Sequence, residues 1–414
     1  MNKILLSALL LLASLQNALA QTGKTIEFRN GLWFNGKDFA EGTWYVRDGL
    51  LTRKAPAKID TVVDLEKRWV VPPLADAHVS CLAGNPSAKE ALKAYASEGV
   101  FYLQILSNTQ QERQDLANLL NKPGTPDALF ANGGLTCSLG TPFLEYEPRA
   151  WDIRTPDQVK ARYEQIRLNR KMLGDGYWFI DSKDDVSKNW DKIKAQKPGV
   201  LSIYLLDADK NGGKEGKGLT ADAAKAIVKK AKKAGLQVFA HVETVDDVRL
   251  GIKLGVNGFA NLPGSNWDGT GDPARFELKP DDLKKLVKKN IAVVPLLSHG
   301  QAAAVSNPAV LEFHKKTLKA LLAEGVPVAI GSDDGSRTMR TELNYWLQIG
   351  AITTPEAMRI LCETTPRAIF PERKIGKLEE GYEASFLALN DNPLGNIMKI
   401  RLISFKVKNG VIVK

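Results

Sequence analysis

The middle of the chain alternates helical and strand patterns, and this alternation restricts the fold more than any other feature. After residue 220, apolar residues recur at helical spacing, with Thr220 placed to cap the helix and Gly235 to end it. An apolar strand is predicted at 236–240, and the same order repeats with strands predicted at 256–260, 291–297 and 326–330. Strands that are apolar almost throughout are buried on both faces, which is typical of a parallel sheet covered by helices. The sequence therefore predicts an α/β fold.

Polar residues stand at the ends of several of these strands. His78, His241 and Asp333 each come just after an apolar strand. An open doubly wound sheet and a closed barrel both fit the alternation. The wide spacing of the three residues favours the barrel, because its strand ends converge on one rim where active sites form. The prediction is a TIM-like (β/α)8 barrel over residues 73–373.

The two ends of the chain have a different pattern. Short apolar and polar segments alternate from 25 to 71 and again from 384 to 411, with turn signals such as Asp48-Gly49 and Asn409-Gly410 between them. Such dipeptides between short strands indicate β-hairpins. We therefore expect one small β-sandwich domain assembled from residues 21–72 and 374–414.

The first twenty residues have the pattern of a secretory signal peptide. Lys3 precedes an apolar run from 4 to 13, and the small residues Ala18 and Ala20 mark a cleavage site after Ala20. The apolar run is too short to cross a bilayer, which takes roughly twenty residues. The prediction is a periplasmic or secreted protein with a signal peptide at 1–20 and no membrane span.

The chain has a formal net charge of +10, which raises the question of a nucleic-acid partner. Much of the positive charge lies at helical spacing, as in residues 225–233, where lysines alternate with apolar positions. This is the solvated face of an amphipathic helix, and no nucleic-acid-binding motif accompanies it. We predict no nucleic-acid partner, and a small molecule as the ligand or substrate.

The segment 70–80 has the sequence VVPPLADAHVS. It resembles the opening metal motif of the amidohydrolase superfamily, in which the first barrel strand ends in His-x-His. The resemblance is to the imidazolonepropionase-like, amidohydrolase-related group, and it continues through 25–80, 218–264, 324–335 and 364–410. It implies the same (β/α)8 barrel that the alternation predicts.

Residue by residue, the resemblance implies a partly substituted metal site. His78, His241 and Asp333 match the first histidine of the motif, the fifth-strand histidine and the eighth-strand aspartate. The other ligand positions are substituted: the second histidine of the motif, the fourth-strand lysine and the sixth-strand histidine correspond to Ser80, Ser202 and Asn261.

The substitutions leave two alternatives for a cofactor. A two-metal centre would need the bridging lysine and both later histidines, those of the fifth and sixth strands, so two metals are not expected. His78, His241 and Asp333 are a candidate single site for one divalent ion, Zn²⁺ or Mn²⁺, since two imidazoles and a carboxylate suffice for a catalytic zinc. In the other alternative no metal binds. His78 and His241 are then buried histidines that bond to the backbone or to Ser80 and Asn261, and Asp333 caps the turn that it forms with Asp334 and Gly335.

Three functions follow from these alternatives. The first is a metal-dependent hydrolase of a carbon–nitrogen bond in a cyclic or amino-acid-like amide, with Asp333 moving the proton and His299 and Arg337 orienting the substrate. The second is a catalytically inactive relative that binds a small molecule or a partner. The third is metal-free acid–base catalysis by His241 and Asp333. We expect His314, which lies within a predicted helix, to be a surface residue.

Overall fold

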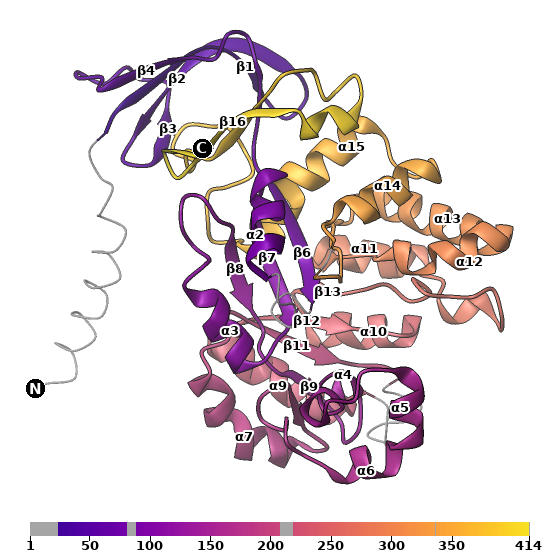
Figure 1. Ribbon diagram of the computed structural model, residues 1–414. Coiled ribbons are helices and arrows are strands. Elements are labelled where there is room, and N and C mark those ends of the chain that lie inside the picture. The colour runs from indigo at the N-terminus through magenta and orange to yellow at the C-terminus, as the bar shows by residue number, and fades with distance from the viewer. Residues whose placement is uncertain (1–23, 81–87, 208–217, 336, 414) are drawn as a thin grey trace, which may run out of the picture. The chain divides into compact units, whose positions relative to one another are not determined.

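The computed structural model describes residues 24–80, 88–207, 218–335 and 337–413 (Figure 1). The predicted signal peptide lies outside the described residues. The chain divides into two compact units, one formed by Met1–Pro73 with Pro371–Lys414 and the other by Leu74–Phe370.

The first unit joins both ends of the chain in one eight-stranded sheet. Its strands follow the order β17-β16-β15-β5-β1-β2-β3, and β4 also pairs with β1. The antiparallel pair of β5 with β15, in which Val71 faces Leu387, connects the two ends. The strands are β1 (Ile26–Phe34), β2 (Phe39–Arg47), β3 (Leu50–Thr52), β4 (Thr61–Asp64), β5 (Trp69–Val71), β15 (Phe386–Leu389), β16 (Ile403–Lys408) and β17 (Val411–Val413).

Turn chemistry and aromatic packing explain this sheet. The hairpins predicted at Asp48-Gly49 and Asn409-Gly410 are confirmed, because β2 pairs with β3 and β16 with β17, and all four turn residues have positive φ. Positive φ at both central residues is what the two-residue turns of twisted hairpins require. On the buried side, the ring centroid of Phe386 lies 5.0 Å from that of Phe28.

The second unit contains parallel strands with helices outside them (Figure 1). Six strands pair in the order β10-β9-β11-β12-β13-β14, and three more in the order β6-β7-β8. The strands are β6 (Leu74–Ser80), β7 (Val100–Ser107), β8 (Asp127–Phe130), β9 (Gly134–Thr136), β10 (Tyr177–Phe179), β11 (Val200–Tyr204), β12 (Gln237–His241), β13 (Gly258–Phe259) and β14 (Ala292–Val293).

The helices cover these strands and carry most of the long connections. The α-helices are α2 (Ala88–Ser97), α3 (Gln110–Ala117), α4 (Phe143–Tyr146), α5 (Pro156–Ala161), α6 (Tyr163–Leu168), α7 (Lys183–Ala195), α9 (Ala221–Lys233), α10 (Val245–Leu254), α11 (Pro280–Lys288), α12 (Gln301–Ser306), α13 (Pro308–Glu324), α14 (Arg340–Gln348), α15 (Thr354–Arg359) and α16 (Thr365–Ile369). Shorter helical turns are η2 (Arg149–Trp151), η3 (Pro273–Arg275), η4 (Leu297–Gly300), η5 (Ile360–Thr364) and, in the first unit, η6 (Ile397–Arg401).

The predicted helix signals act as expected in this unit. The side chain of Thr220 accepts a hydrogen bond from the backbone N–H of Ala223 at the start of α9. Gly255 and Gly325 end α10 and α13 in the left-handed conformation, which glycine adopts without a steric penalty.

The last two predicted strands are shorter than expected, but backbone hydrogen bonds follow their course. Residues 326–330 meet β14 through Val293 N–H to Pro327 O (2.9 Å) and reach β6 through Ala77 N–H to Ile330 O (2.8 Å). Proline interrupts both ladders, because Pro295 and Pro327 have no N–H to donate. On the far side, Gly199 N–H donates to Phe130 O (2.9 Å), which links β8 to the start of β11. These bonds bring the carboxyl ends of β6, β11, β12 and β13 and residue 331 onward to the same edge.

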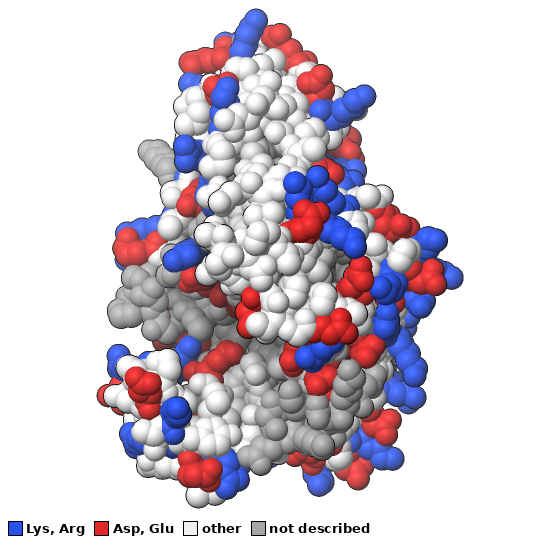
Figure 2. Space-filling model, turned by 90° about the vertical axis from the view of Figure 1, so that its right-hand side faces the viewer, with Lys and Arg blue, Asp and Glu red and all other residues white. Residues whose placement is uncertain are grey.

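In the part of the chain that the structure describes, no helix combines the length and the apolar character needed to span a membrane. On the face shown in Figure 2, lysine and arginine side chains are interspersed with aspartate and glutamate rather than gathered in one basic patch.

Candidate functional site

A cavity of about 250 Å³ lies at the carboxyl ends of the strands in the second unit, and we call it the strand-end pocket. Six of the residues singled out from the sequence line it, whereas Ser202 and Arg337 do not. Arg337 is largely exposed and lies 3.7 Å from the carboxylate of Asp334. The lining residues are His78, Ser80, Ser107, Thr141, Glu145, Tyr204, Leu206, His241, Asn261, Ser265, Asn266, Leu296, His299 and Asp333.

His78 and Asp333 form a direct pair in this pocket. The Nδ1 atom of His78 lies 2.7 Å from the carbonyl oxygen of Ala260 and must donate to it, because a carbonyl only accepts. The other ring nitrogen, Nε2, lies 3.2 Å from Oδ1 of Asp333. Backbone bonds fix the pair, since the N–H of Asp333 donates to His78 O at 2.7 Å.

The pairing shifts both groups toward their charged forms. Burial by itself lowers the pKa of His78, but the charge and hydrogen bond of Asp333 outweigh it, and the pKa lies above its ordinary value. Burial by itself raises the pKa of Asp333, but His78, and then His299 with Nε2 3.8 Å away, hold the pKa well below its ordinary value.

His241 stands apart from this pair. Its Nε2 lies 3.1 Å from the hydroxyl of Ser202, and its ring stacks on Tyr204 with centroids 4.2 Å apart and planes 5° from parallel. Burial, and second the positive charge of His78, lower the pKa of His241 to about 3. The imidazole is therefore neutral at physiological pH.

Ser80 and Asn261, which the resemblance places at ligand positions, form hydrogen bonds of their own. The hydroxyl of Ser80 donates to the backbone carbonyl of Asp333 (3.0 Å). The amide of Asn261 bonds twice to Val242, accepting from its N–H at 2.9 Å and donating to its C=O at 2.6 Å. Asn261 thus extends the pairing of β12 with β13 by one residue, Val242.

The fit of a metal ion can be tested on these donors. Within residues 24–80, 88–207, 218–335 and 337–413, no three His, Cys, Asp or Glu side chains are placed to hold one ion. His78 and Asp333 contact each other, and the Nε2 of His241 is on Ser202. In this arrangement His78, His241 and Asp333 share a pocket, but they do not fit one common ion.

His299 owes its position to a buried carboxylate. The side chain of Glu342, on α14, accepts hydrogen bonds from the backbone N–H groups of Leu297 (2.6 Å) and Ser298 (2.8 Å). Both belong to η4, the short turn that carries His299 to the pocket. Glu342 was not singled out from the sequence, because nothing in its spacing indicates a partner on another element.

Sequence reasoning also missed Glu145 and Tyr204. Glu145 lies on α4 at the rim, and the surrounding protein raises its pKa to about 7, with burial the larger cause and the charge of Asp333 the second. Tyr204 could have been predicted from the sequence, because it follows Ser202 by two residues and so lies on the same face of β11.

The prediction that His314 is a surface residue is wrong. His314 is fully buried on α13, with Nδ1 2.7 Å from the hydroxyl of Tyr345 and Nε2 3.2 Å from the carbonyl of Gly264. It stands four residues after Val310 and four before Leu318, both buried, and therefore on the apolar face of the helix. That spacing was the signal for burial.

Comparison with known proteins agrees with the fold described above. The model of the Amidohydrolase family matches residues 209–413. Among solved structures, an amidohydrolase superposes with a TM-score of 0.70 and 17% sequence identity, covering 94% of this chain and 98% of that one. Residues 209–413 thus belong to the Amidohydrolase family, and the chain as a whole shares the fold of these proteins. The predicted α/β class is confirmed by this likeness, which extends to amidohydrolases built on a TIM barrel.

Two further proteins to which the chain is similar have described activities. The ochratoxinase of Aspergillus niger is 27% identical over 181 residues, which are 42% of this chain and only 36% of the relative's length. The crystal structure of A. niger ochratoxinase superposes with a TM-score of 0.71 at 16% identity, covering 95% of this chain and 96% of that one. A Xaa-Pro dipeptidase with methionine bound in its active site gives a TM-score of 0.69 at 15% identity, covering 94% and 100%.

Proposed function

We propose that the strand-end pocket binds a small amide-like molecule without a catalytic metal ion, so that this protein is a binding relative of the amidohydrolases. The observation that carries the proposal is the hydrogen bonding of the residues that stand where the resemblance expects metal ligands. Ser80, Ser202 and Asn261 all direct their polar atoms to neighbouring residues of the rim. A buried polar network that satisfies its own members has no need of an ion to balance it.

The remaining polar groups of the pocket suggest the chemistry of the ligand. The Oδ2 atom of Asp333, the half-exposed His299 and the exposed Asn266 supply acceptors and donors for an amide group. A second cavity, of about 710 Å³, carries the basic residues Arg149, Arg154 and Lys160. Because Glu145 lines both cavities, they adjoin at its side chain. The ligand that fits best has an amide at the strand ends and an anionic group in the basic cavity.

A single-metal hydrolase of a carbon–nitrogen bond is the second candidate. Its support is the bond from His78 Nδ1 to the Ala260 carbonyl, since a metal-bound histidine commonly donates its other N–H to such an acceptor. The neutral His241 and the ionised Asp333 are also in the protonation states that metal ligands need. This candidate requires His241 to turn away from Ser202.

Elemental analysis decides between the two candidates. We would purify the protein without a metal-affinity tag, incubate it with excess Zn²⁺ or Mn²⁺, desalt it and count bound ions per chain, with the variant His241→Ala alongside. The binding proposal expects far less than one ion per chain and the same value in the variant. Near one ion per chain, lost in His241→Ala, would overturn it in favour of the hydrolase.

Restoring the lost ligands gives a second test of the metal question. In Ser80→His with Asn261→His the imidazoles return, but the two bonds from Asn261 to Val242 are lost. We expect no gain in zinc affinity and a lower melting temperature. A large gain in zinc affinity at unchanged stability would mean that the pocket still has the geometry of a metal site.

The ligand class is tested with a matched pair of compounds. Calorimetric titration would compare N-acetyl-L-leucine, which has a free carboxylate, with the neutral N-acetyl-L-leucinamide. We expect the carboxylate to bind about tenfold more tightly, a difference of about 1.4 kcal/mol, and Arg149→Gln with Lys160→Gln to remove the advantage. Lys232→Gln, on the exposed face of α9, is the control. Equal binding of both compounds contradicts the anionic part of the proposal.

Two further features are proposed together with this function. The apolar run at 4–13 and the small residues before Gln21 support export to the periplasm or beyond, and amino-terminal sequencing of protein from that fraction should begin at Gln21. The bonds from β14 to 326–330 and on to β6 support an eight-stranded closed barrel, and the shared sheet of the two chain ends supports a β-sandwich. A crystal structure tests both.

A further inference from the structure

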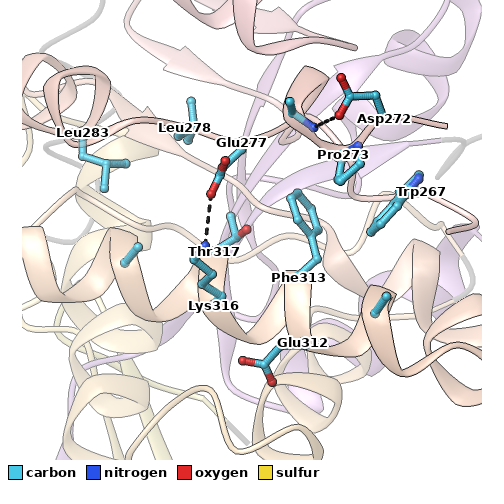
Figure 3. Close-up of a pocket in the computed structure, with 13 residues that line it drawn as sticks. Trp267, Asp272, Pro273, Glu277, Leu278, Leu283, Glu312, Phe313, Lys316 and Thr317 are labelled. Atoms are coloured by element: carbon cyan, nitrogen blue, oxygen red, sulfur yellow. Dashed lines mark hydrogen bonds and ion pairs between the residues drawn. The ribbon is translucent and has the colours of Figure 1, made fainter. Parts of the chain in front are cut away.

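A third cavity in the same unit is lined by none of the residues discussed so far. It encloses about 460 Å³ between the connection that leads from β13 to α11 and the side of α13 (Figure 3). This volume is within the range of small-molecule sites, roughly 300 to 1,000 Å³. We call it the outer cavity. It is lined by Trp267, Asp272, Pro273, Ala274, Glu277, Leu278, Leu283, Ala309, Glu312, Phe313, Lys316, Thr317 and Ala320.

Two aromatic rings form one end of the outer cavity. Trp267 and Phe313 pack edge to face with their centroids 5.5 Å apart and their planes at 73°. The indole N–H of Trp267 donates to the carbonyl of Thr270, so its polar atom is satisfied and its ring is left to contact a ligand. Leu278 and Leu283 lie toward the other end in Figure 3. Such walls take an apolar or aromatic body.

The charged groups of the cavity are unbalanced. Glu277 is neutralised by two ammonium groups, since Lys316 reaches it at 3.0 Å and Lys279 at 2.8 Å. Asp272 accepts a hydrogen bond from the backbone N–H of Ala274. Within the part of the chain that the structure describes, neither Asp272 nor Glu312 has an ion pair with a lysine or arginine. Three carboxylates and one ammonium line the cavity, and the Lys279 ammonium beside Glu277 adds a second positive charge. The balance is still negative, and it lies at the exposed side chains Asp272 and Glu312, which favours a cation there.

We propose that the outer cavity is a second binding site, for a small organic cation with an aromatic or apolar body. The body would lie against Trp267 and Phe313, and the ammonium would face Asp272 or Glu312. An ammonium near an aromatic face gains from the ring quadrupole as well as from the carboxylates. The proposal does not depend on the function of the strand-end pocket, because the two cavities have no lining residue in common.

Three compounds of similar size and different charge test the proposal. Calorimetric titration of the full protein would compare 2-phenylethylamine, 2-phenylethanol and 3-phenylpropanoate. We expect the amine to bind about tenfold more tightly than the alcohol, and the acid to bind most weakly. Equal or weaker binding of the amine, or no binding of any compound at millimolar concentration, overturns the proposal.

Variants locate the binding. Glu312→Gln with Asp272→Asn should weaken the amine about tenfold and leave the alcohol unchanged, whereas Glu324→Gln, at the exposed end of the same helix, should change neither. Ala320→Phe fills the cavity from an exposed helix position and should abolish the binding of amine and alcohol alike. Ala309→Phe does the same from another wall if the first variant folds poorly. Undiminished amine binding in a folded filling variant places the amine elsewhere and overturns the proposal.

Discussion

The strand-end pocket and the outer cavity lie in the same unit, but their polar groups are used in opposite ways. In the strand-end pocket, His78 is bonded to Asp333, His241 to Ser202 and Asn261 to Val242. In the outer cavity, Asp272 and Glu312 face the space without a cationic partner among the described residues. The strand-end pocket thus has most of its polar groups paired with one another, whereas the outer cavity retains charge for a ligand.

Two buried histidines give the comparison a measurable form. His78, in the strand-end pocket, has its pKa raised because a carboxylate faces it. His314 lies next to Phe313, which lines the outer cavity. Burial disfavours the charged form of His314 and lowers its pKa, and the carbonyl of Gly264 opposes this effect only in part. Equal burial therefore gives opposite shifts, because the partner of each ring decides which protonation state is stabilised.

The largest effect is expected from Asp333→Asn, which removes the charge facing His78. Breaking a buried ion pair from one side costs about 3 to 5 kcal/mol, and the partial exposure of Asp333 reduces this to about 2 kcal/mol. Asp333 contributes stability that is present above its unfolded pKa of 3.8 and lost as the pH falls through its folded value. His78 contributes stability that is present below 6.5 and lost as the pH rises through its folded value.

The cost of Asp333→Asn should therefore be greatest near pH 5 and should shrink toward pH 9. Urea unfolding across this range measures it. Asp334→Asn, the same change at the next residue, is the control. A cost that does not depend on pH would mean that the two side chains are not an ion pair.

The second effect is His314→Phe, with the opposite dependence on pH. Phenylalanine keeps the ring but leaves the Tyr345 hydroxyl and the Gly264 carbonyl without their partner, which costs about 1 to 2 kcal/mol at pH 8. The depressed pKa of His314 gives the native protein stability that is present above 6.5 and lost as the pH falls. The cost of the variant should thus shrink below pH 6.5 in the same unfolding measurements. If both variants followed the same trend, the contrast between the two histidines would be wrong.

A smaller effect, of about 1 kcal/mol, is expected from Asn261→Ala. The change leaves the N–H and C=O of Val242 without the side chain that pairs with them, although water at the rim can replace part of the loss. Because no titrating group is removed, the cost should stay constant from pH 5 to 9. Asn266→Ala, an exposed asparagine of the same pocket, should change the melting temperature little. An equal cost in both variants would mean that the amide of Asn261 contributes nothing specific.

The smallest effect on stability is expected from Glu312→Gln. A carboxylate without a partner at a surface site contributes within about 0.5 kcal/mol, and removing it relieves repulsion from Asp272 and Glu277 if it changes anything. Thermal unfolding should therefore be unchanged or slightly raised. A clear loss of stability would show that Glu312 has a structural partner and would weaken the case for a ligand-ready cavity.

Local rules predicted much of this molecule. Apolar runs and helix-ending glycines such as Gly255 and Gly325 indicated the α/β class, which the likeness to solved amidohydrolases confirms. The prediction that His78, His241 and Asp333 stand just after strands also placed them near each other, because the ends of parallel strands share an edge.

What sequence could not predict was the partner of each side chain. Whether the Nε2 of His241 meets Asp333 or Ser202 depends on a single ring rotation, and spacing does not encode it. Glu145 reaches the pocket, and Glu342 reaches the turn that carries His299, from elements distant in sequence, and their positions depend on how long connections fold. The role of His78, His241 and Asp333 as metal ligands stays a prediction.

The two hydrogen bonds between the side-chain amide of Asn261 and the backbone of Val242 limit which residues can replace this asparagine. A primary amide offers an acceptor and a donor side by side, which matches the N–H and the C=O of one residue in a strand. The two nitrogens of an imidazole point in different directions. A histidine at this position would thus lose at least one of the two hydrogen bonds and open the strand end. Histidine at residue 261 would therefore lower the stability of the protein before it could bind an ion, so the strand end itself opposes a metal ligand at this position.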